Sequence, residues 1–383
     1  MKITNVEPII LSAPLREPWR IGTAVFTQMS ATLVKIDTDE GISGIGECLV
    51  RFSPEAGAAI VDRILSPAIM GQDPFNVELL WDKMYAVMRG RGHSKGFMLE
   101  AMSGVDIALW DIIGKTLGQP VHRILGSYGR TKLPVYASSL LFKPTEVLVR
   151  EAEELASRGY SGIKLKIGQG IETDIRNVRE IRKALGERVQ LMADANCAFD
   201  TLAAMQVGRQ MEAEGVYWFE EPVAPENLDG YAKLAQSLDM AVASGESEFT
   251  RWAFKELMAR NAIDIIQPDI GRVGGFSEAR KIAALASAFD IPVAPHTGAS
   301  AAVSIAASLQ WGAALPNLLV FEYMYPPNPL REELLRDRPL PGLRHSEPLD
   351  GFRVELHAET GPLRHFHVAV LHWRERFQQQ LLA

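Results

Sequence analysis

The chain has 383 residues, of which 47% are hydrophobic and 23% charged, and it carries a formal net charge of −7. This is the composition of a globular protein with enough apolar residues for one large domain and a smaller one. The negative charge without runs of Lys or Arg argues against nucleic-acid binding, and no apolar run approaches the roughly 20 residues of a membrane helix.

The remaining composition favours a cytoplasmic protein that acts on small molecules. The first residues lack a basic stretch leading into a long apolar one, so we predict no signal peptide. The two cysteines, Cys48 and Cys197, fit a reducing compartment better than a disulfide scaffold. Gly-rich phosphate-binding loops are absent, which predicts that no nucleotide cofactor is used.

The N-terminal third predicts an α+β domain over residues 1–130. Residues 1–46 have the pattern of strands, with an apolar strand at Ala31–Ile36 and a turn at Asp39–Gly41. The following segment, to about residue 126, has the pattern of helices, most clearly at Leu99–Leu117. Strands followed by helices are typical of an α+β arrangement.

From Leu133 onward, short apolar runs alternate with helical segments at a spacing of about 25 to 30 residues, which is typical of a parallel barrel. A Pro-rich stretch at 326–329 follows the eighth run and leaves no room for a full final helix. We therefore predict a modified (β/α)8 TIM-type barrel, probably (β/α)7β, at residues 131–345. The candidate strands are Val135–Ser139, Gly162–Ile167, Val189–Asn196, Val216–Pro222, Ala241–Glu246, Ile263–Asp269, Ile291–His296 and Leu318–Tyr323.

The last segment, residues 346–383, is expected to return to the N-terminal domain. Asp350–Leu356 has the pattern of a strand, and Leu371–Leu382 has the pattern of a helix. The expected architecture is a barrel covered by an α+β capping domain, which the N-terminal segment and this C-terminal tail form together.

Charged or imidazole side chains stand at the ends of the candidate strands. A single carboxylate at such a position is more commonly a helix cap or a solvated turn residue, but seven in succession argue against that interpretation. Barrel enzymes build their active sites at the carboxyl ends of the strands. The seven residues are Lys166, Asp194, Glu220, Glu246, Asp269, His296 and Glu322.

Strand alternation places pairs of these polar residues on a common face. Lys164 and Lys166 point the same way and would repel each other, which predicts carboxylate-rich surroundings and an acidic substrate. Asp194 and Asn196 also share a face. On the far side of the barrel from Lys166, Asp269 could orient His296 and raise its basicity.

Three carboxylates end successive strands of the predicted barrel. Asp194, Glu220 and Glu246 could converge from neighbouring strands, with no thiol or second imidazole beside them. Oxygen donors of this kind suit a hard cation, which favours Mg²⁺ over Zn²⁺.

In these residues the sequence resembles the mandelate racemase branch of the enolase superfamily, along nearly the whole chain. Lys164-Leu165-Lys166 is similar to the KxK motif of the branch, Asp194-Ala195-Asn196 to its DxN motif, and Glu220-Glu221-Pro222 to its EEP motif. The joint order also includes Gly245-Glu246, the Asp269 and His296 dyad, Glu322 and the helical signature at 103–111. Residues 364–383 depart from the familiar pattern.

The resemblance implies Mg²⁺-dependent removal of the proton next to a substrate carboxylate, which gives an ene-diolate. Asp194, Glu220 and Glu246 would hold the metal, and Lys164 and Glu322, the latter if protonated, would stabilise the negative charge. Lys166 and His296 would act on opposite sides of the α-carbon, and we expect the metal and Lys164 to depress the pKa of Lys166. His296, as imidazolium, would protonate a departing β-hydroxyl.

The reaction favoured by the resemblance is dehydration of an acid sugar, an aldonate or aldarate, to a 2-keto-3-deoxy acid. Racemisation or epimerisation of a 2-hydroxy acid on the same residues remains an alternative, and an inactive metal-binding relative is a third. Cycloisomerases and dipeptide epimerases usually carry a second lysine after the sixth strand. Asp269 and Gly271 stand there instead, which disfavours these two reactions.

Substrate selection is expected from capping-domain loops at about Arg16–Phe26 and Cys48–Phe52. Trp19, Arg20, Arg51 and Phe52 are the candidates, the arginines for a distal carboxylate or hydroxyls. The alternative is that each is an ordinary surface residue. The expected partners are a small carboxylate substrate and further copies of the chain, since barrel enzymes of this kind are commonly symmetric homo-oligomers.

Overall fold

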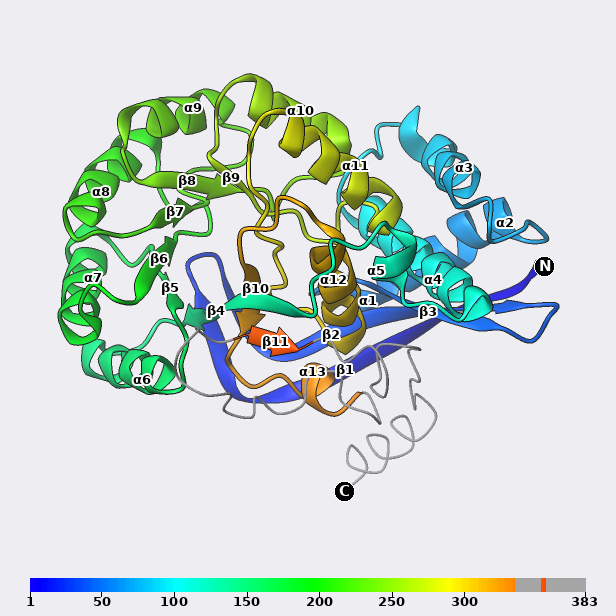
Figure 1. Cartoon of the computed structure of the whole chain (residues 1–383), viewed down its shortest axis with the longest axis horizontal. Helices are drawn as coiled ribbons and strands as arrows, with labels where there is room; N and C mark the ends of the chain where they lie inside the picture. Colours follow the sequence, from blue (N-terminus) through cyan, green and yellow to red (C-terminus); the bar gives the residue numbers. More distant parts are fainter. Residues whose placement is uncertain (335–352, 356–383) are drawn as a thin grey trace.

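The N-terminal region begins with a three-stranded antiparallel sheet. The structure is a computed structural model that describes residues 1–334 and 353–355. Strands β1 (Ile3–Ile21), β2 (Ala24–Thr38) and β3 (Ser43–Cys48) lie in the order β1-β2-β3, which confirms the predicted strands. The expected loop at Arg16–Phe26 is instead the tip of the β1–β2 hairpin, because Trp19 pairs with Phe26 across it. Figure 1 shows this long hairpin reaching along the barrel.

Helices complete the N-terminal region, as the sequence predicted. Helix α4 packs along β3 so closely that a Cβ atom added to Gly46 would lie 1.8 Å from the Gly104 carbonyl oxygen. Its face toward the core is apolar from Leu99 to Ile113, which buries most of its length. The elements are α1 (Pro54–Ile60), the π-helical segment η1 (Val61–Leu65), α2 (Ser66–Ile69), α3 (Val77–Arg89), α4 (Phe97–Leu117) and α5 (Val121–Ile124).

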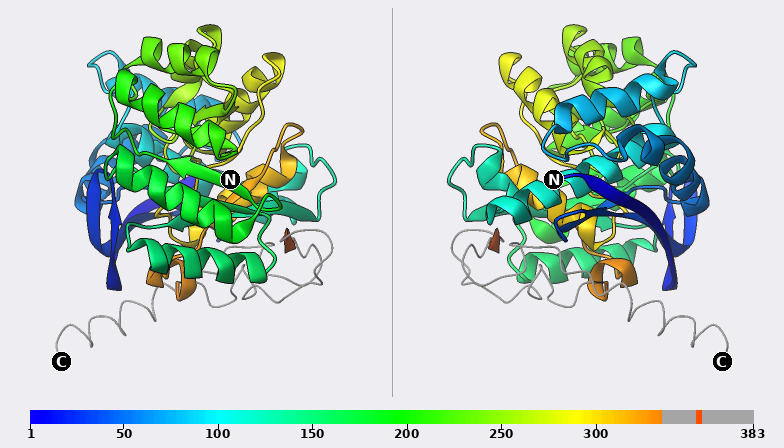
Figure 2. Two further views of the ribbon diagram at one scale, coloured as in Figure 1. Left: turned by 90° about the vertical axis from the view of Figure 1, so that its left-hand side faces the viewer. Right: turned by 90° about the vertical axis from the view of Figure 1, so that its right-hand side faces the viewer.

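A curled, mostly parallel sheet forms the second region, with helices around its outside (Figures 1 and 2). Neighbouring strands pair in the order β10-β4-β5-β6-β7-β8-β9. The strands are β4 (Lys132–Leu140), β5 (Gly162–Lys166), β6 (Gln190–Asp194), β7 (Trp218–Glu220), β8 (Ala241–Ser244), β9 (Ile265–Ile266) and β10 (Phe321–Met324). The helices are α6 (Thr145–Ser157), α7 (Ile171–Leu185), α8 (Thr201–Ala213), α9 (Leu228–Ser237), α10 (Thr250–Ala259), α11 (Gly275–Ala288) and α12 (Ala302–Ala314).

The seventh predicted strand is reduced to a single bridging residue. Val293 pairs with Ile266 on one side and with Leu318 on the other, and it thereby links β9 to the segment that leads into β10. Because β10 pairs in parallel with β4, the sheet closes on itself. The predicted fold class, a modified (β/α)8 barrel of the (β/α)7β kind beside a separate capping domain, is confirmed.

After β10 the described chain forms only the short helix α13 (Pro329–Glu332), as the Pro-rich stretch predicted. Part of the predicted strand at Asp350–Leu356 is present as β11 (Arg353–Glu355). It pairs with β4 of the barrel and not with the N-terminal region, which corrects the expected packing of that strand. The predicted helix at Leu371–Leu382 lies outside the described residues.

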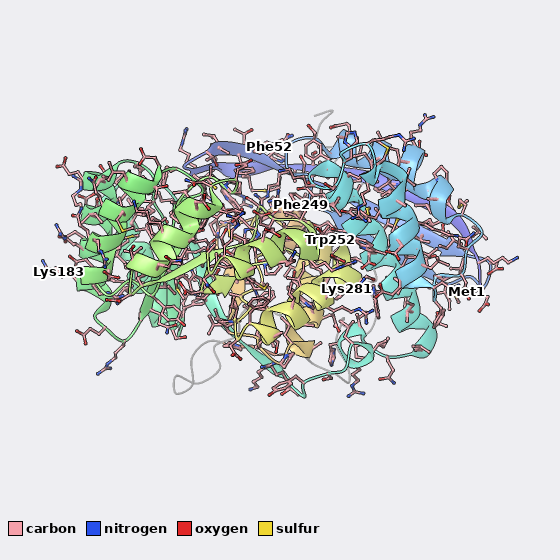
Figure 3. All side chains as sticks on the ribbon, turned by 90° about the horizontal axis from the view of Figure 1, so that it is seen from above. Met1, Phe52, Lys183, Phe249, Trp252 and Lys281 are labelled. Atoms are coloured by element: carbon pink, nitrogen blue, oxygen red, sulfur yellow. The ribbon has the colours of Figure 1, made fainter. Side chains whose placement is uncertain are left out.

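The two regions meet along α3 and α4 on one side and α10 and α11 on the other. Trp252 of α10 stacks on Tyr85 of α3 at 5.3 Å, and Lys281 Nζ lies 2.6 Å from Glu78 Oε2. Figure 3 shows Trp252 and Lys281 at this boundary. Among residues 1–334 and 353–355, no helix has the length and apolar character needed to cross a membrane.

Candidate active site

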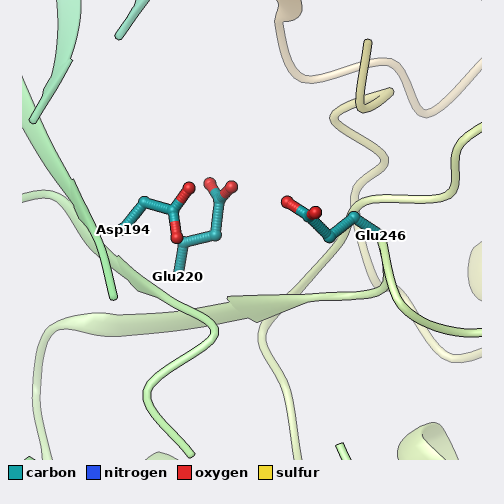
Figure 4. Close-up of side chains that lie close together, drawn as sticks. All are labelled: Asp194, Glu220 and Glu246. Carbon is teal, nitrogen blue, oxygen red and sulfur yellow. The ribbon is translucent and has the colours of Figure 1, made fainter. Parts of the chain in front are cut away.

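Three buried carboxylates converge at the carboxyl ends of β6, β7 and β8 (Figure 4). Asp194 and Glu220 are register partners in neighbouring strands, and Glu246 follows the end of β8. One oxygen of each lies within 4.8 Å of the others. Oxygen donors at this spacing suit a hard divalent cation.

Lys164 and Lys166 project from β5 into the same space, and their surroundings are rich in carboxylates, as predicted. Lys164 Nζ lies 2.5 Å from Glu220 Oε1 and 2.8 Å from Glu322 Oε1, and Lys166 donates to Asp194. Burial lowers the pKa of Lys164, but Glu220 and Glu322 raise it by more, so the net pKa lies well above the ordinary value. Lys164 is therefore charged.

The predicted depression of the Lys166 pKa depends on a bound cation and stays a prediction, and in the chain taken by itself the shift has the other direction. Burial lowers the pKa of Lys166, and Lys164 lowers it further, but the Asp194 carboxylate raises it by more. The net pKa lies above the ordinary value. The sequence analysis considered the repulsion from Lys164 but not the Asp194 register partner, which stands beside Lys166 across β5 and β6.

Asp269 and His296 face the triad from the opposite side of the barrel. His296 Nδ1 lies 2.7 Å from Asp269 Oδ2, and His296 Nε2 lies 3.0 Å from Glu246 Oε2. Burial lowers the pKa of His296, whereas Glu246, Glu322 and the hydrogen bond with Asp269 raise it, to about 10. The imidazole is therefore protonated at neutral pH. Both residues lie beyond the paired ends of their strands, on the loops that follow β9 and Val293.

Glu322 of β10 is ionised and accepts hydrogen bonds instead of donating one. Its oxygens lie 2.8 Å from Lys164 Nζ and 2.6 Å from the Thr297 backbone nitrogen. Burial raises the pKa of Glu322, but Lys164 and His296 lower it by more, so the net pKa is well below the usual range. The conditional expectation of a protonated Glu322 is corrected accordingly.

Asn196 lies directly beyond the metal-site carboxylate on β6, with its backbone in the left-handed region at φ 43°. Its backbone nitrogen donates to Asp194 Oδ1 over 2.8 Å. The buried Asn196 Oδ1 has no hydrogen-bond partner within the described part of the chain. An unsatisfied buried oxygen at this position fits a bound cation or ligand.

Two functional neighbours of Glu220 escaped the sequence analysis. Gln267 Nε2 donates to Glu220 Oε2 over 2.6 Å, and Trp218 Nε1 donates to the same oxygen over 3.1 Å. Trp218 stands two residues before Glu220, and Gln267 two before Asp269. The alternation rule that paired Lys164 with Lys166 could have found both residues.

The capping region covers the site, but not all of its predicted residues reach the cavity. Trp19, Phe26 and Arg51 line a cavity of about 30 Å³ above Lys166 and His296. Arg51 donates to the Gly298 carbonyl oxygen over 3.0 Å and lies 3.6 Å from Glu246 Oε1.

The other two candidate residues of the capping region lie outside this lining. Arg20 is exposed, and its carbonyl oxygen accepts from the Phe142 backbone nitrogen. Phe52 is 65% exposed and stacks on Phe26 with ring centroids 4.8 Å apart. Alternation along a hairpin turns Trp19 and Arg20 to opposite faces. The segment was expected to be a loop, so this rule was not applied to it.

Family models match both regions of the chain. Residues 5–126 match the N-terminal domain of mandelate racemase and muconate lactonizing enzyme, and residues 147–346 match the enolase C-terminal domain-like model. The chain belongs to the mandelate racemase branch of the enolase superfamily.

Similar proteins are named as enzymes of different reactions. The chain is 36% identical to D-galactarolactone cycloisomerase of Agrobacterium fabrum, over 88% of this chain and 91% of the relative. It is 35% identical to arabinonate dehydratase of Saccharolobus solfataricus, over 81% of this chain and 83% of the relative. The crystal structure of 3,6-anhydro-D-galactonate cycloisomerase of Zobellia galactanivorans superposes with a TM-score of 0.85 and 31% identity, over 98% and 99% of the chains.

These names limit what the dyad excludes. The sequence analysis disfavoured cycloisomerisation because a second lysine is missing after the sixth strand. Two similar proteins are nevertheless named as cycloisomerases of sugar-acid derivatives. The absence of this lysine therefore does not separate dehydration from every cycloisomerisation. Membership of the branch supports the prediction that the protein is an enzyme.

Proposed function

We propose that this protein is a Mg²⁺-dependent acid-sugar dehydratase that converts an aldonate or aldarate to a 2-keto-3-deoxy acid. The observation that carries the proposal is the placement of two proton-transfer groups at the two ends of the carboxylate triad: Lys166 donates to Asp194, and His296 Nε2 lies 3.0 Å from Glu246 Oε2. Two separate groups suit elimination of a β-hydroxyl, because one can take the α-proton while the other protonates the departing oxygen. The dehydratase name of one relative supports it.

In this proposal Asp194, Glu220 and Glu246 hold the metal, which fits their buried oxygens. Mg²⁺ would supply positive charge to the substrate carboxylate and so stabilise an ene-diolate, as it does for the superfamily. Lys164 adds a fixed positive charge beside Glu322. Asn196 offers the free oxygen of its amide to the same space.

Lys166 is the proposed base, and it must leave Asp194 and lose its proton before it can accept one from the α-carbon. His296 is the proposed acid. Asp269 holds its Nδ1, which leaves Nε2 as the atom that delivers a proton to the departing hydroxyl. Trp19 and Phe26 limit the access of water to the reacting carbons.

The test is turnover of mono- and diacid sugars with Mg²⁺ in D2O, with NMR detection of 2-keto products and of deuterium at the α-carbon. We expect a keto product that disappears with EDTA. Lys166→Ala should lower the rate by about 10²- to 10⁴-fold. The exposed lysine Lys183 provides the control, and Lys183→Ala should retain full turnover.

Two other reactions use the same residues, and the experiment separates them. The cycloisomerase names of two relatives favour a lactone or anhydro sugar acid as a second substrate class, so both are included in the library. Deuterium incorporation with inverted configuration and no keto product would indicate a racemase. No turnover and no exchange with Mg²⁺ bound would contradict the proposal and favour an inactive relative.

A further inference from the structure

Five barrel helices begin after a residue whose side chain cannot cap them, and α11 and α12 are two of these. The residue before α11 is Gly274, and the residue before α12 is Ala301. The first N–H groups of a helix have no partner inside the helix, and most helices satisfy them with a Ser, Thr, Asp or Asn side chain at this position. Asp200 does so for α8, accepting from the Ala203 backbone nitrogen over 2.8 Å. Helices α11 and α12 need a cap from elsewhere.

A carboxylate of the capping domain caps α12. Glu47 lies on β3 and is completely buried, far from α12 in sequence. Its Oε1 accepts from the Ala301 backbone nitrogen over 2.7 Å, and its Oε2 accepts from the Ser304 backbone nitrogen over 2.8 Å. Both oxygens of Glu47 thus accept a backbone N–H at the start of α12.

A second carboxyl group of the capping domain caps α11 through one of its oxygens. Asp106 lies on α4, completely buried, and its Oδ2 accepts from the Ser277 backbone nitrogen over 3.0 Å. The approach is close enough that a Cβ atom on Gly275 would lie 2.4 Å from that oxygen. On the same helix, the Ser103 hydroxyl accepts from the Gly274 nitrogen over 2.9 Å.

The two capped helices follow the two loops that carry the acid-base dyad. Asp269 begins the loop that ends at α11, and His296 begins the loop that ends at α12. The capping domain holds the second loop at another point as well, because Arg51 donates to the Gly298 carbonyl oxygen. The barrel holds the same loop through the bridging Val293 and through the His296 backbone nitrogen, which donates to the Pro268 carbonyl oxygen over 3.2 Å. Thr297 also donates to Glu322 of β10. The caps act together with these contacts.

We propose that Glu47 and Asp106 are positioning residues for the His296 and Asp269 dyad, so that docking of the capping domain sets the geometry of the acid on that side of the site. The inference rests on the proposed function for the role of the dyad, but the placement of the loops can be tested without turnover. We expect Lys166 and Asp194 to keep their positions in variants of these caps, because their strands β5 and β6 pair over five residues.

The test compares Glu47→Ala, Glu47→Gln and Asp106→Ala with the wild-type protein. Asp111→Asn is the control, because Asp111 lies on α4 near Asp106 and is buried, but accepts from Ile45 and Lys115 of its own domain. Hydrogen exchange followed by mass spectrometry should show faster exchange at residues 297–304 for both Glu47 variants and at residues 270–277 for Asp106→Ala. Asp111→Asn should leave both segments unchanged.

Kinetics with the substrate found in the turnover screen provide the second readout. A displaced acid should lower kcat by on the order of 10- to 100-fold with KM little changed, since small misplacements of catalytic groups have effects of this size. The loss of kcat should be larger for Glu47→Ala than for Glu47→Gln, because Gln retains one acceptor oxygen. Asp111→Asn should keep the wild-type kcat.

The outcomes separate the inference from the proposed function. Unchanged exchange in both loops for Glu47→Ala and Asp106→Ala would overturn the inference, as would normal kcat values in variants with faster exchange. If the wild-type protein turns over no acid sugar, the proposed function fails, and the exchange data with an NMR titration of the His296 imidazole still decide whether the caps position it. A shifted His296 titration in Glu47→Ala but not in Asp111→Asn supports the inference.

Discussion

Asp106 shows how burial sets the charge of a side chain in this protein. Burial raises its pKa to about 7, although the hydroxyl and backbone N–H of Ser277 lower it. The folded state therefore holds a proton that the unfolded state releases at lower pH. The stability that comes from this proton is fully present below the unfolded pKa of 3.8 and is lost as the pH rises through about 7.

We predict that Asp106→Asn changes the pH dependence of stability. The free energy of unfolding of the wild-type protein should fall relative to that of the variant between about pH 5 and about pH 8, by about 3 kcal/mol. Urea unfolding at the two pH values measures the difference. Parallel pH profiles for the two proteins would show that Asp106 does not titrate in this range.

At the scale of elements, β3 and α4 approach each other through glycine. A Cβ atom on Gly46 would collide with the backbone at Gly104, which cannot move aside as a flexible side chain could. We predict that Gly46→Ala lowers the free energy of unfolding by at least about 3 kcal/mol. Gly90→Ala is the control, because nothing lies within 4 Å of the added atom. Equal urea midpoints for the two variants would contradict the close approach.

The elements that the sequence predicted best are those with a strong local signal. The α4 segment and the strands that carry Lys166, Asp194 and Glu220 were predicted with bounds close to the observed ones, because apolar periodicity and charged strand ends coincide there. The short β9 and the single bridging Val293 were predicted too long. Pairing ends where the backbone turns away to form the dyad loops, and an apolar run does not record that turn.

Side-chain charge in the site was harder to predict than side-chain position. The approach of His296 to Asp269 could be expected from their neighbouring strands, and it is present. The protonation states of Lys166 and Glu322 could not be predicted, because each depends on a partner from another strand at hydrogen-bond distance. The helix caps from Glu47 and Asp106 escaped for the same reason, since their partners lie far away in sequence.

At the scale of the whole molecule, the covered cavity is too small for the proposed substrate. Its volume is about 30 Å³, whereas sites that bind small molecules typically measure about 300–1,000 Å³. The β1–β2 hairpin tip with Trp19 and Phe26 forms much of the cover. The cover must therefore move outward to admit a sugar acid and return to exclude water.

We predict that ligand binding slows hydrogen exchange at the hairpin tip. With Mg²⁺ and a substrate found by the turnover screen, amides at residues 19–26 should exchange more slowly than in the free protein. Amides at residues 31–36 of the same strand β2 pack on the core and should not change. A uniform change along β2 would point to general stabilisation, and no change at the tip would contradict an opening cover.

The reduced seventh strand divides the barrel into two unequal halves. Strands β4, β5 and β6, which carry the two lysines and Asp194, pair over several residues. The half with Asp269 and His296 is joined through the two-residue β9, the bridging Val293 and single backbone bonds such as that from the His296 nitrogen to the Pro268 carbonyl oxygen. A protein engineer who transplanted this barrel without its N-terminal region would keep the well-paired strands that carry Lys166 and Asp194. The loop after Val293 would lose its contacts with Glu47 and Arg51, and the acid would need new support there.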